Sequence, residues 1–216
     1  MSDDLRGAIL AAADAVDAAR GELGRLDGAA GDGDHGMTMS IGARNVRRKL
    51  AALPADAPPG DVLRATSEAM AGVGGAIGPL YSGALAAIAG EVDGPGWSTM
   101  TPVTRLRTIA EAAERAITAL GHAAPGDKTV VDALHPLAAS LRDAETAGTE
   151  PGAAALDAVA AAEAGTASTA DMVARLGRAS RLGERSRGLP DAGATSFSII
   201  ARALVEALTG SRPEAG

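Results

Sequence analysis

The chain has 216 residues, of which 46% are hydrophobic but only 1% aromatic, so its core must be built from Ala, Leu, Val, Ile and Met. The net charge of −7 and the lack of a basic stripe argue against nucleic acid as a partner. The absence of cysteine excludes disulfides and thiolate chemistry. No apolar stretch approaches the ~20 residues of a membrane span, and the acidic N-terminus does not fit a signal peptide. We expect a single cytoplasmic domain over residues 1–216.

Apolar residues recur at helical spacing along most of the chain, with Pro and Gly clusters between the periodic segments. No alternating run of β-branched residues is long enough for a strand. The abundant alanine favours closely packed helices, so we expect an all-α bundle of antiparallel helices. The expected helices run over residues 3–22, 37–52, 61–73, 79–90, 102–121, 128–146, 152–180 with a break, and 193–209.

Four connections between these helices combine glycine with charged or turn-forming residues, whereas the others are plain linkers. The four follow roughly alternate helices, and in an antiparallel bundle alternate loops lie at the same end. The sequence therefore predicts that they converge at one rim and form a single site. These connections are residues 27–36, 72–79, 125–128 and 178–193.

The first connection is acidic. Asp27, Asp32 and Asp34 fall within eight residues that contain no Lys or Arg. Close carboxylates repel one another unless a cation is bound, and the intervening glycines let the backbone turn them toward one point. Carboxylate oxygens suit Mg²⁺, whereas the ligand pattern of a calcium-binding helix-loop-helix is absent. A solvated acidic turn is the alternative. His35, beside the carboxylates, is a candidate hydrogen-bond donor to a phosphate or a support for the metal ligands.

The second connection is glycine-rich and runs from Gly72 to Gly78, with Pro79 opening the next helix. It matches neither the phosphate-binding loop of nucleotide triphosphatases nor a dinucleotide-binding fingerprint. Exposed backbone N–H groups at a helix N-terminus would bind phosphate. A flexible loop or tight helix packing is the alternative.

The third connection has the sequence Pro-Gly-Asp-Lys-Thr. Asp127 is placed to cap a helix, and Lys128 is available for charge compensation or for a phosphate, with capping alone as the alternative. Val130 would then project from the first helical turn, where an apolar residue at the rim packs against a nucleotide base.

The fourth connection concentrates four arginines in a chain that is acidic overall. Arginine binds phosphate through two parallel hydrogen bonds and neutralises the charge that develops during phosphoryl transfer. A solvated basic face is the alternative. Asp191 follows the arginines as the N-cap of the last helix and as a candidate ligand contact. The arginines are Arg178, Arg181, Arg185 and Arg187.

Read together, GDGDHG, GGAIGPLYSG, PGDKTVVDALHPL and GRASRLGERSRGLPDAGATS resemble the nucleotide-binding L subunit of dihydroxyacetone kinase in order and spacing. The resemblance extends over nearly the whole chain. It implies a closed barrel of eight antiparallel helices that binds ADP or ATP and two Mg²⁺ ions at one rim, which agrees with the bundle expected from periodicity.

The resemblance also assigns roles to individual residues. Asp27, Asp32 and Asp34 match the magnesium-binding aspartates, and Arg178 matches the catalytic arginine. At two positions the chain departs from the family pattern: Thr38 stands where Asn is usual, and Ile77 where Ser is usual. The residues matching nucleotide-binding positions are His35, Thr38, Ala76, Ile77, Gly121, Val130, Arg178, Asp191 and Gly193.

The family mechanism implies that a separate K subunit holds dihydroxyacetone covalently, so this chain would act as a kinase only with that partner. The phosphoryl donor is either exchangeable ATP or a phosphotransferase-system phosphocarrier that recharges bound ADP. Two other functions stay open: a kinase subunit for another small ketose or sugar, and a regulatory or lipid-binding helical barrel without phosphoryl transfer. The oligomeric state is open too, with a homodimer as one option.

Overall fold

The structure is a computed structural model that describes residues 2–210, and within that range every regular element is a helix. The all-α class expected from the sequence is confirmed. The α-helices are α1 (Ser2–Ala18), α2 (Arg20–Ala30), α3 (His35–Ala51), α4 (Pro59–Ala71), α5 (Ile77–Val92), α6 (Pro102–Gly121), α7 (Val131–Ala147), α8 (Pro151–Ser168) and α9 (Ala192–Thr209). Three short 3-10 helices join them: η1 (Trp97–Thr99), η2 (Thr169–Asp171) and η3 (Ala179–Ser186).

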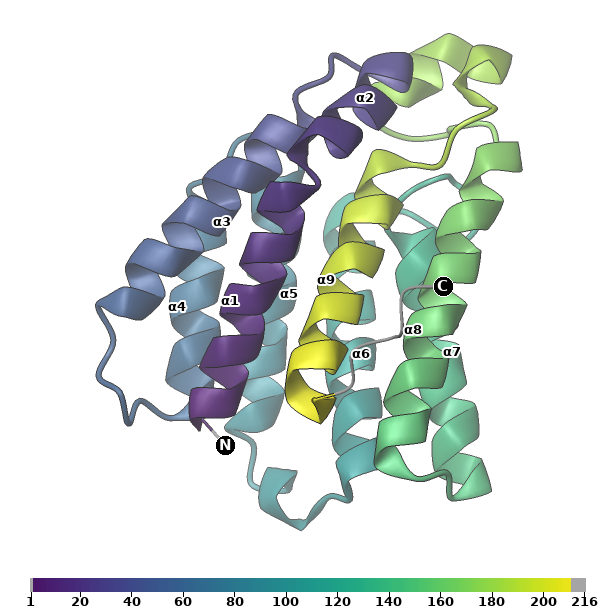
Figure 1. Cartoon of the computed structure of the whole chain (residues 1–216). Helices are drawn as coiled ribbons and strands as arrows, with labels where there is room; N and C mark the ends of the chain where they lie inside the picture. Colours follow the sequence, from purple (N-terminus) through teal and green to yellow (C-terminus); the bar gives the residue numbers. More distant parts are fainter. Residues whose placement is uncertain (1, 211–216) are drawn as a thin grey trace.

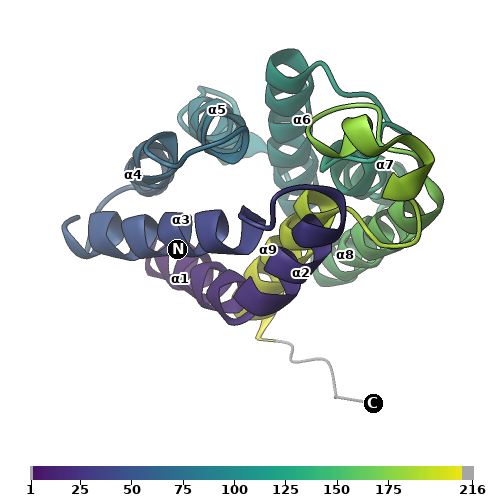
Figure 2. The ribbon, with the colours of Figure 1, turned by 90° about the horizontal axis from the view of Figure 1, so that it is seen from above.

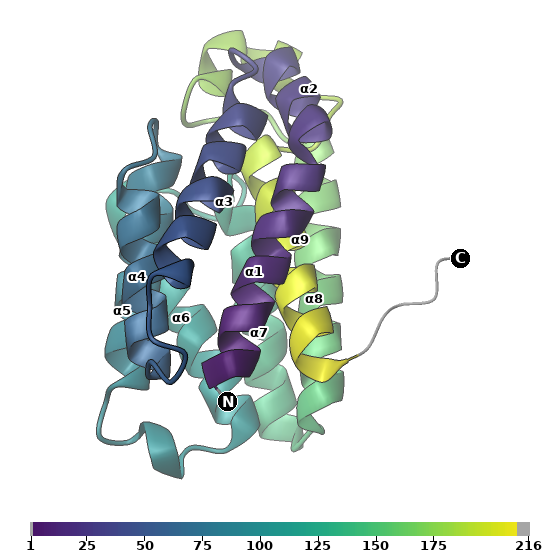
Figure 3. The same ribbon diagram turned by 60° about the vertical axis from the view of Figure 1, so that its left-hand side comes forward.

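All the α-helices except α2 form a closed ring in which each packs on the next, from α1 through α3 to α9, and α9 packs back on α1. Seen from above, the ring is complete (Figure 2). Figure 3 shows α1 between its neighbours α3 and α9, and α2 lies across one end of the barrel (Figure 1). The closed antiparallel barrel expected from the sequence is therefore confirmed.

The helices pack through small side chains. Where α7, α8 and α9 meet, the buried cluster is Ala133, Ala162 and Ala194, each with no exposed surface. Alanine costs no side-chain entropy on burial and lets helix backbones approach closely. The low aromatic content is thus compatible with closely packed helices.

Inside the ring lies a cavity of about 110 Å³ bordered almost entirely by apolar atoms from α1, α3, α4, α5 and α9. An engineered apolar cavity that binds benzene has roughly 150 Å³. The cavity is smaller than that one, and its apolar lining bears on the lipid-binding alternative. Its lining includes Ile9, Val16, Met39, Met70, Tyr81 and Leu204.

The first expected helix, residues 3–22, is instead two helices. The axis changes at Ala19, and α2 then continues to Ala30, because Leu23 and Leu26 are buried on one face and Ala29 and Ala30 favour the helix. Asp27 therefore lies in the last turn of α2, not in a loop as expected.

The expected helix over residues 152–180 ends at Ser168. Thr169 is fully buried, and its Oγ1 donates to the carbonyl of Thr166 at 2.6 Å. The Thr169 carbonyl accepts from the amide of Met172 at 3.2 Å in a 3-10 turn, and also from a lysine of another connection, described below. The chain then turns through η2 and η3, so Arg178 lies in an irregular segment.

No helix in the described part of the chain is long and apolar enough to cross a membrane.

Candidate functional site

The four unusual connections lie at the same end of the barrel. In the structure they are the links between α2 and α3, α4 and α5, α6 and α7, and α8 and α9, and all four appear at the upper end in Figure 1. The alternation of an antiparallel ring produces this arrangement. The predicted convergence at one end is thus confirmed, and the distances within it decide which residues can act together.

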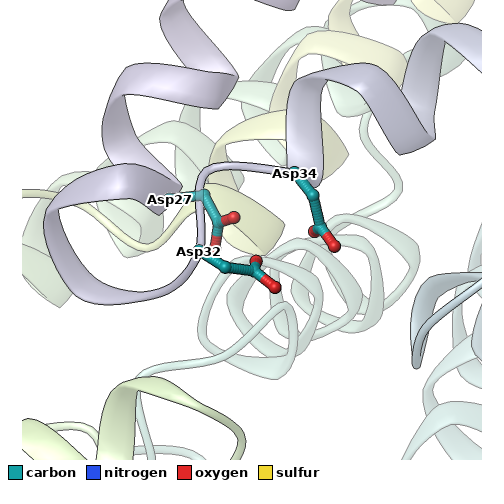
Figure 4. Close-up of side chains that lie close together, drawn as sticks. All are labelled: Asp27, Asp32 and Asp34. Atoms are coloured by element: carbon teal, nitrogen blue, oxygen red, sulfur yellow. The ribbon is translucent and has the colours of Figure 1, made fainter.

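The three aspartates of the acidic connection come together. Each offers a carboxylate oxygen that lies within 4.8 Å of the others. Figure 4 shows the three carboxylates side by side. Asp27 comes from α2, Asp32 from the loop, and Asp34 from the position before α3. Gly33 between them has a left-handed φ of 77°, which glycine adopts without strain. The site therefore offers hard oxygen ligands and no nitrogen or sulfur ligand.

Gly36 explains why the carboxylates converge. A Cβ at this position would lie 2.0 Å from the carbonyl oxygen of Arg20 and 2.9 Å from the amide nitrogen of Gly24. The start of α3 therefore rests directly on the backbone of α2. The backbone N–H of His35 donates to Asp27 Oδ2 at 3.2 Å across this contact. The positive end of the α3 dipole thereby faces the carboxylates and reduces their repulsion.

Arg178 reaches this cluster from the far side of the rim. Its Nη2 donates to Asp34 Oδ1 at 2.9 Å, and its Nη1 contacts both Asp34 and Asp32. All three side chains are about half exposed. Segments 144 residues apart in sequence thus place one guanidinium against two of the three carboxylates. The cluster already attracts a positive group, as a cation site requires.

The His35 ring faces the barrel rather than the rim. It is buried, and its Nε2 lies 3.0 Å from Ser196 Oγ of α9. Burial lowers the pKa of His35, and the Asp27 charge opposes this shift only in part. The ring is therefore expected to be neutral near pH 7. His35 contacts the acidic cluster through its backbone N–H, so a supporting role fits better than a direct phosphate contact by the ring.

The glycine-rich connection ends where α5 begins at Ile77. A Cβ on Gly78 would lie 2.0 Å from the carbonyl of Val73, so only glycine permits this tight return of the chain. Ala76 is exposed and precedes the helix, which leaves the first amides of α5 without partners in the helix. The Ile77 side chain is half-buried and packs into the core beside Tyr81. The bulk of isoleucine is therefore directed into the barrel.

The third connection differs from its prediction in two ways. Asp127 does not cap α7: its Oδ2 accepts from the amide of Ala124 at 2.8 Å, and the residue before α7 makes no side-chain cap. That residue is Val130, which is 8% exposed and packs in an apolar cluster with Ile117. It does not project at the rim as expected, because the turn before α7 folds it inward. Its place beside an adenosine stays a prediction.

Lys128 is also turned inward. It is 4% exposed, and its Nζ donates to the carbonyl oxygens of Thr169 at 2.6 Å and Leu189 at 2.8 Å. Of the two uses expected for it, charge compensation is found in part: burial lowers the pKa of Lys128, and the nearby Asp191 charge opposes this shift. A phosphate contact stays a prediction. The ammonium also links the third connection to the fourth.

The fourth connection ends at Asp191, which is the N-cap of α9 as predicted. Its Oδ2 accepts from the amide of Ala194 at 2.8 Å. Burial raises the pKa of Asp191 to about 6 despite that hydrogen bond and the nearby Lys128 charge. Gly193, in the first turn, lies close to Val130: a Cβ on this glycine would be 3.8 Å from the Val130 nitrogen. The structure thus brings two of the predicted nucleotide residues into one place.

Other predicted positions are more isolated. Thr38 lies in the first turn of α3, where its amide donates to the carbonyl of Asp34 at 2.9 Å. Gly121 is the last residue of α6, and a Cβ there would touch Leu80 at 3.4 Å. Both lie on the site end of the barrel.

Asp132 is an organising residue that the sequence reasoning missed. Its carboxylate accepts from the amides of Gly126 at 2.5 Å and Thr129 at 2.7 Å, and it is buried. The signal was present: Thr129 and Asp132 have the spacing of a capping box before an apolar run. Recognising it would have moved the start of α7 from residue 128 to beyond Thr129.

Comparison with known proteins adds the family. A model described as the DAK2 domain matches residues 29–206. The chain belongs to the DAK2 domain family. Among curated relatives, D-erythrulose kinase of Mycolicibacterium smegmatis is 41% identical over 206 residues, which are 92% of this chain and 34% of that protein. The ADP-binding subunit DhaL of the PEP-dependent dihydroxyacetone kinase of Escherichia coli is 37% identical over 180 residues, covering 83% of this chain and 84% of that subunit.

The DAK2 chain therefore spans about a third of the length of the erythrulose kinase and most of the length of the DhaL subunit. Among solved structures, the native dihydroxyacetone kinase of C. freundii superposes with a TM-score of 0.72 at 23% identity, over 94% of this chain and 34% of that one. The same kinase in complex with AMP-PNP and Mg²⁺ gives a TM-score of 0.69 at 24% identity. These two likenesses establish the shared barrel fold.

Proposed function

We propose that this chain is the nucleotide-carrying subunit of a dihydroxyacetone-type kinase, which binds ADP or ATP with Mg²⁺ and passes the phosphoryl group to a small ketose held by a separate K subunit. The observation that carries this proposal is the set of three carboxylates within 4.8 Å of one another, faced by Arg178 at the loop end of the barrel. A binding site for phosphates and a metal needs both charges in one place.

The residues present fit magnesium. Asp27, Asp32 and Asp34 supply only oxygen ligands, and they already draw a guanidinium toward them. In the proposed complex these carboxylates hold two Mg²⁺ ions, which neutralise charge on the phosphate oxygens. Arg178 then binds phosphate oxygens through its planar guanidinium and stabilises the charge that develops during transfer.

The remaining residues position the nucleotide. The free amides at Ala76 and Ile77 open α5, where the helix dipole favours an anion, so phosphates are assigned to this end. Thr38 and His35 lie in the first turn of α3, next to the proposed metal ligands. Asp191 fixes the start of α9. The small or apolar residues Gly121, Val130 and Gly193 are assigned to the adenosine.

The acceptor is the less defined part of the proposal. The names of the relatives include both dihydroxyacetone and erythrulose kinases, and the relative with 41% identity acts on D-erythrulose. Since the ketose would be bound by the K subunit, this chain's residues do not select it. The relative in E. coli is PEP-dependent, which favours a phosphotransferase-system phosphocarrier as a further partner in one branch of the family.

Calorimetric titration with ATP and ADP, each with and without Mg²⁺, tests the proposal. We expect tight binding that requires Mg²⁺. If ADP scarcely dissociates, a phosphocarrier is the donor; if both nucleotides exchange freely, ATP is the donor. The absence of binding under all four conditions would eliminate the proposal and favour a regulatory barrel. Addition of a K subunit with dihydroxyacetone or erythrulose then identifies the acceptor.

A further inference from the structure

Lys128 is one of only two lysines in the chain, and it is buried. Lysine is almost never buried to this extent unless its ammonium is hydrogen-bonded, because removing the charge from water is costly. Two carbonyl oxygens, those of Thr169 and Leu189, accept from it at 2.6 and 2.8 Å. The buried charge is thus committed to holding backbone rather than ligand.

The two carbonyls stand at the two ends of one segment, residues 170–188, which we call the basic loop. The ends are also joined directly: the amide of Gly188 donates to the carbonyl of Ala170 at 2.8 Å, and the amide of Asp191 donates to Thr169 Oγ1 at 2.8 Å. Lys128 therefore closes the neck of a loop that follows α8 and precedes α9. A closed neck reduces the conformations open to the residues within it.

The turn that carries Lys128 is itself held in place. Lys128 has a left-handed φ of 62°, which is unfavourable for any residue with a Cβ. The Asp132 carboxylate binds the amides on both sides of it, at Gly126 and Thr129, and so maintains this conformation. Locally strained backbone persists where the surrounding contacts fix it. The strain here directs the ammonium inward.

Arg178 lies near the middle of the basic loop, away from the neck, and contacts Asp32 and Asp34. A cavity of about 80 Å³ lies between the loop and α2, bordered by Asp27, Lys128 and Arg185 among others, and η3 contacts α2 beside it. The neck attaches the loop on its inner side. The amide of Arg175, which donates to the carbonyl of Asp127 at 3.1 Å, ties the loop to the same turn.

We propose that Lys128 is a positioning residue that acts through Arg178: by closing the neck of the basic loop, it holds this arginine against the acidic cluster, where the nucleotide phosphates are bound. The inference rests on the proposed function for the role of Arg178. The closed neck itself does not depend on that function.

Hydrogen exchange on the protein without ligand tests the neck. In Lys128→Met the amides of Arg175, Gly188 and Asp191 should exchange at least about tenfold faster, while amides in the middle of α7 and α9 keep their rates. Lys49→Met is the matched control, since Lys49 is exposed on α3 and pairs with Glu68. Unchanged exchange at the neck in Lys128→Met would overturn the proposal.

A double-mutant cycle on Mg²⁺-ADP affinity tests the route through Arg178. Lys128→Met should weaken binding about tenfold in the wild-type background and less than about twofold in Arg178→Met, because the arginine that it positions is then missing. Equal losses of Mg²⁺-ADP affinity in the two backgrounds would mean that Lys128 affects binding without acting through Arg178, and the proposal fails. If the wild type binds no ADP, the proposed function fails and the exchange experiment alone decides whether Lys128 closes the neck.

Lys128→Gly provides a second variant in case Lys128→Met does not fold. Glycine removes the ammonium but relieves the left-handed backbone, so the fold gains stability at the turn while the neck loses its donor. We expect the same faster exchange at Gly188 and the same dependence on Arg178. Wild-type exchange and wild-type affinity in a folded Lys128→Gly protein would contradict the proposal.

Discussion

The acidic segment, residues 27–36, and the basic loop, residues 170–188, meet across one rim of the barrel, yet they are built in opposite ways. The acidic segment is organised by neighbours in sequence: Gly36 lets α3 rest on α2, and Gly33 turns the chain between two carboxylates. The basic loop is organised from outside, by Lys128 of a different connection. The proposed metal ligands are therefore brought together by contacts close in sequence, whereas the position of Arg178 depends on long-range contacts.

Loss of a carboxylate should have the largest effect. Asp32→Asn removes one proposed ligand without disturbing the fold, because Asp32 is half exposed. We expect Mg²⁺-dependent nucleotide affinity to fall by about 1,000-fold, which is about 4 kcal/mol. Calorimetry measures this loss of affinity. The control is Asp56→Asn, because Asp56 is exposed in the connection between α3 and α4, at the end of the barrel opposite the site. Wild-type affinity in Asp32→Asn would show that Asp32 is not a metal ligand.

Gly36→Ala should disrupt the backbone contact between α2 and α3 that brings the acidic segment together. The added Cβ would meet the Arg20 carbonyl at 2.0 Å, so α2 and α3 must separate. We expect a loss of about 3 kcal/mol in the free energy of unfolding, or about 6–12 °C in melting temperature. Gly21→Ala, where the added Cβ meets nothing within 4 Å, is the control and should be neutral or slightly stabilising. Equal melting temperatures for the two variants would contradict this account.

The free energy of unfolding should depend on pH through Asp191, whose amide forms part of the neck of the basic loop. Burial raises the pKa of Asp191 to about 6, from 3.8 for the free carboxyl. The folded protein then binds more protons than the unfolded chain between these values, so this contribution to stability is present below about pH 4 and is lost as the pH rises through 6.

Asp191→Asn keeps an oxygen that can cap α9 but does not titrate. Relative to this variant, the wild type should lose about 2 to 3 kcal/mol of stability between pH 4 and pH 7, measured by chemical denaturation at both pH values. A stability difference between the two proteins that does not change with pH would show that burial does not raise the pKa of Asp191.

The smallest effect is expected for Arg178→Lys. Lysine keeps the positive charge but loses the paired hydrogen bonds that the guanidinium makes with Asp34. We expect about tenfold weaker Mg²⁺-nucleotide binding, or about 1.4 kcal/mol. Arg181→Lys, exposed on the same loop, is the control. Equal losses for both variants would indicate a general charge effect and not a specific role for Arg178.

The sequence predicted the acidic segment well because its geometry is local. The spacing of glycines among Asp27, Asp32 and Asp34 indicated that the carboxylates converge, and the structure brings them within reach of one ion. Asp191 as the N-cap of α9 was recognised for the same reason. The alternation of helices predicted which connections share one end. The position of Asp27 was predicted wrongly. It lies in the last turn of α2 and not in a loop, because Leu23 and Leu26 are buried and extend the helix.

The third and fourth connections were predicted less well, since their contacts join distant segments. Val130 was expected to project at the rim, and Lys128 to be available for charge compensation or a phosphate, but both side chains are buried. The helix expected over residues 152–180 ends at Ser168, where the Thr169 carbonyl meets Lys128. Nothing adjacent to residue 169 in sequence predicts a hydrogen bond to a residue 41 positions earlier.

The helical class, the alanine core, the alternation of loops and the acidic cluster follow from the sequence, because helical periodicity and glycine-spaced turns act over a few residues. The contact of the buried Lys128 with the neck of the basic loop, and that of Arg178 with Asp32 and Asp34, exist only in the folded chain. Burial of a charge is permitted only where partners from other elements arrive, and the folded barrel alone brings those partners together.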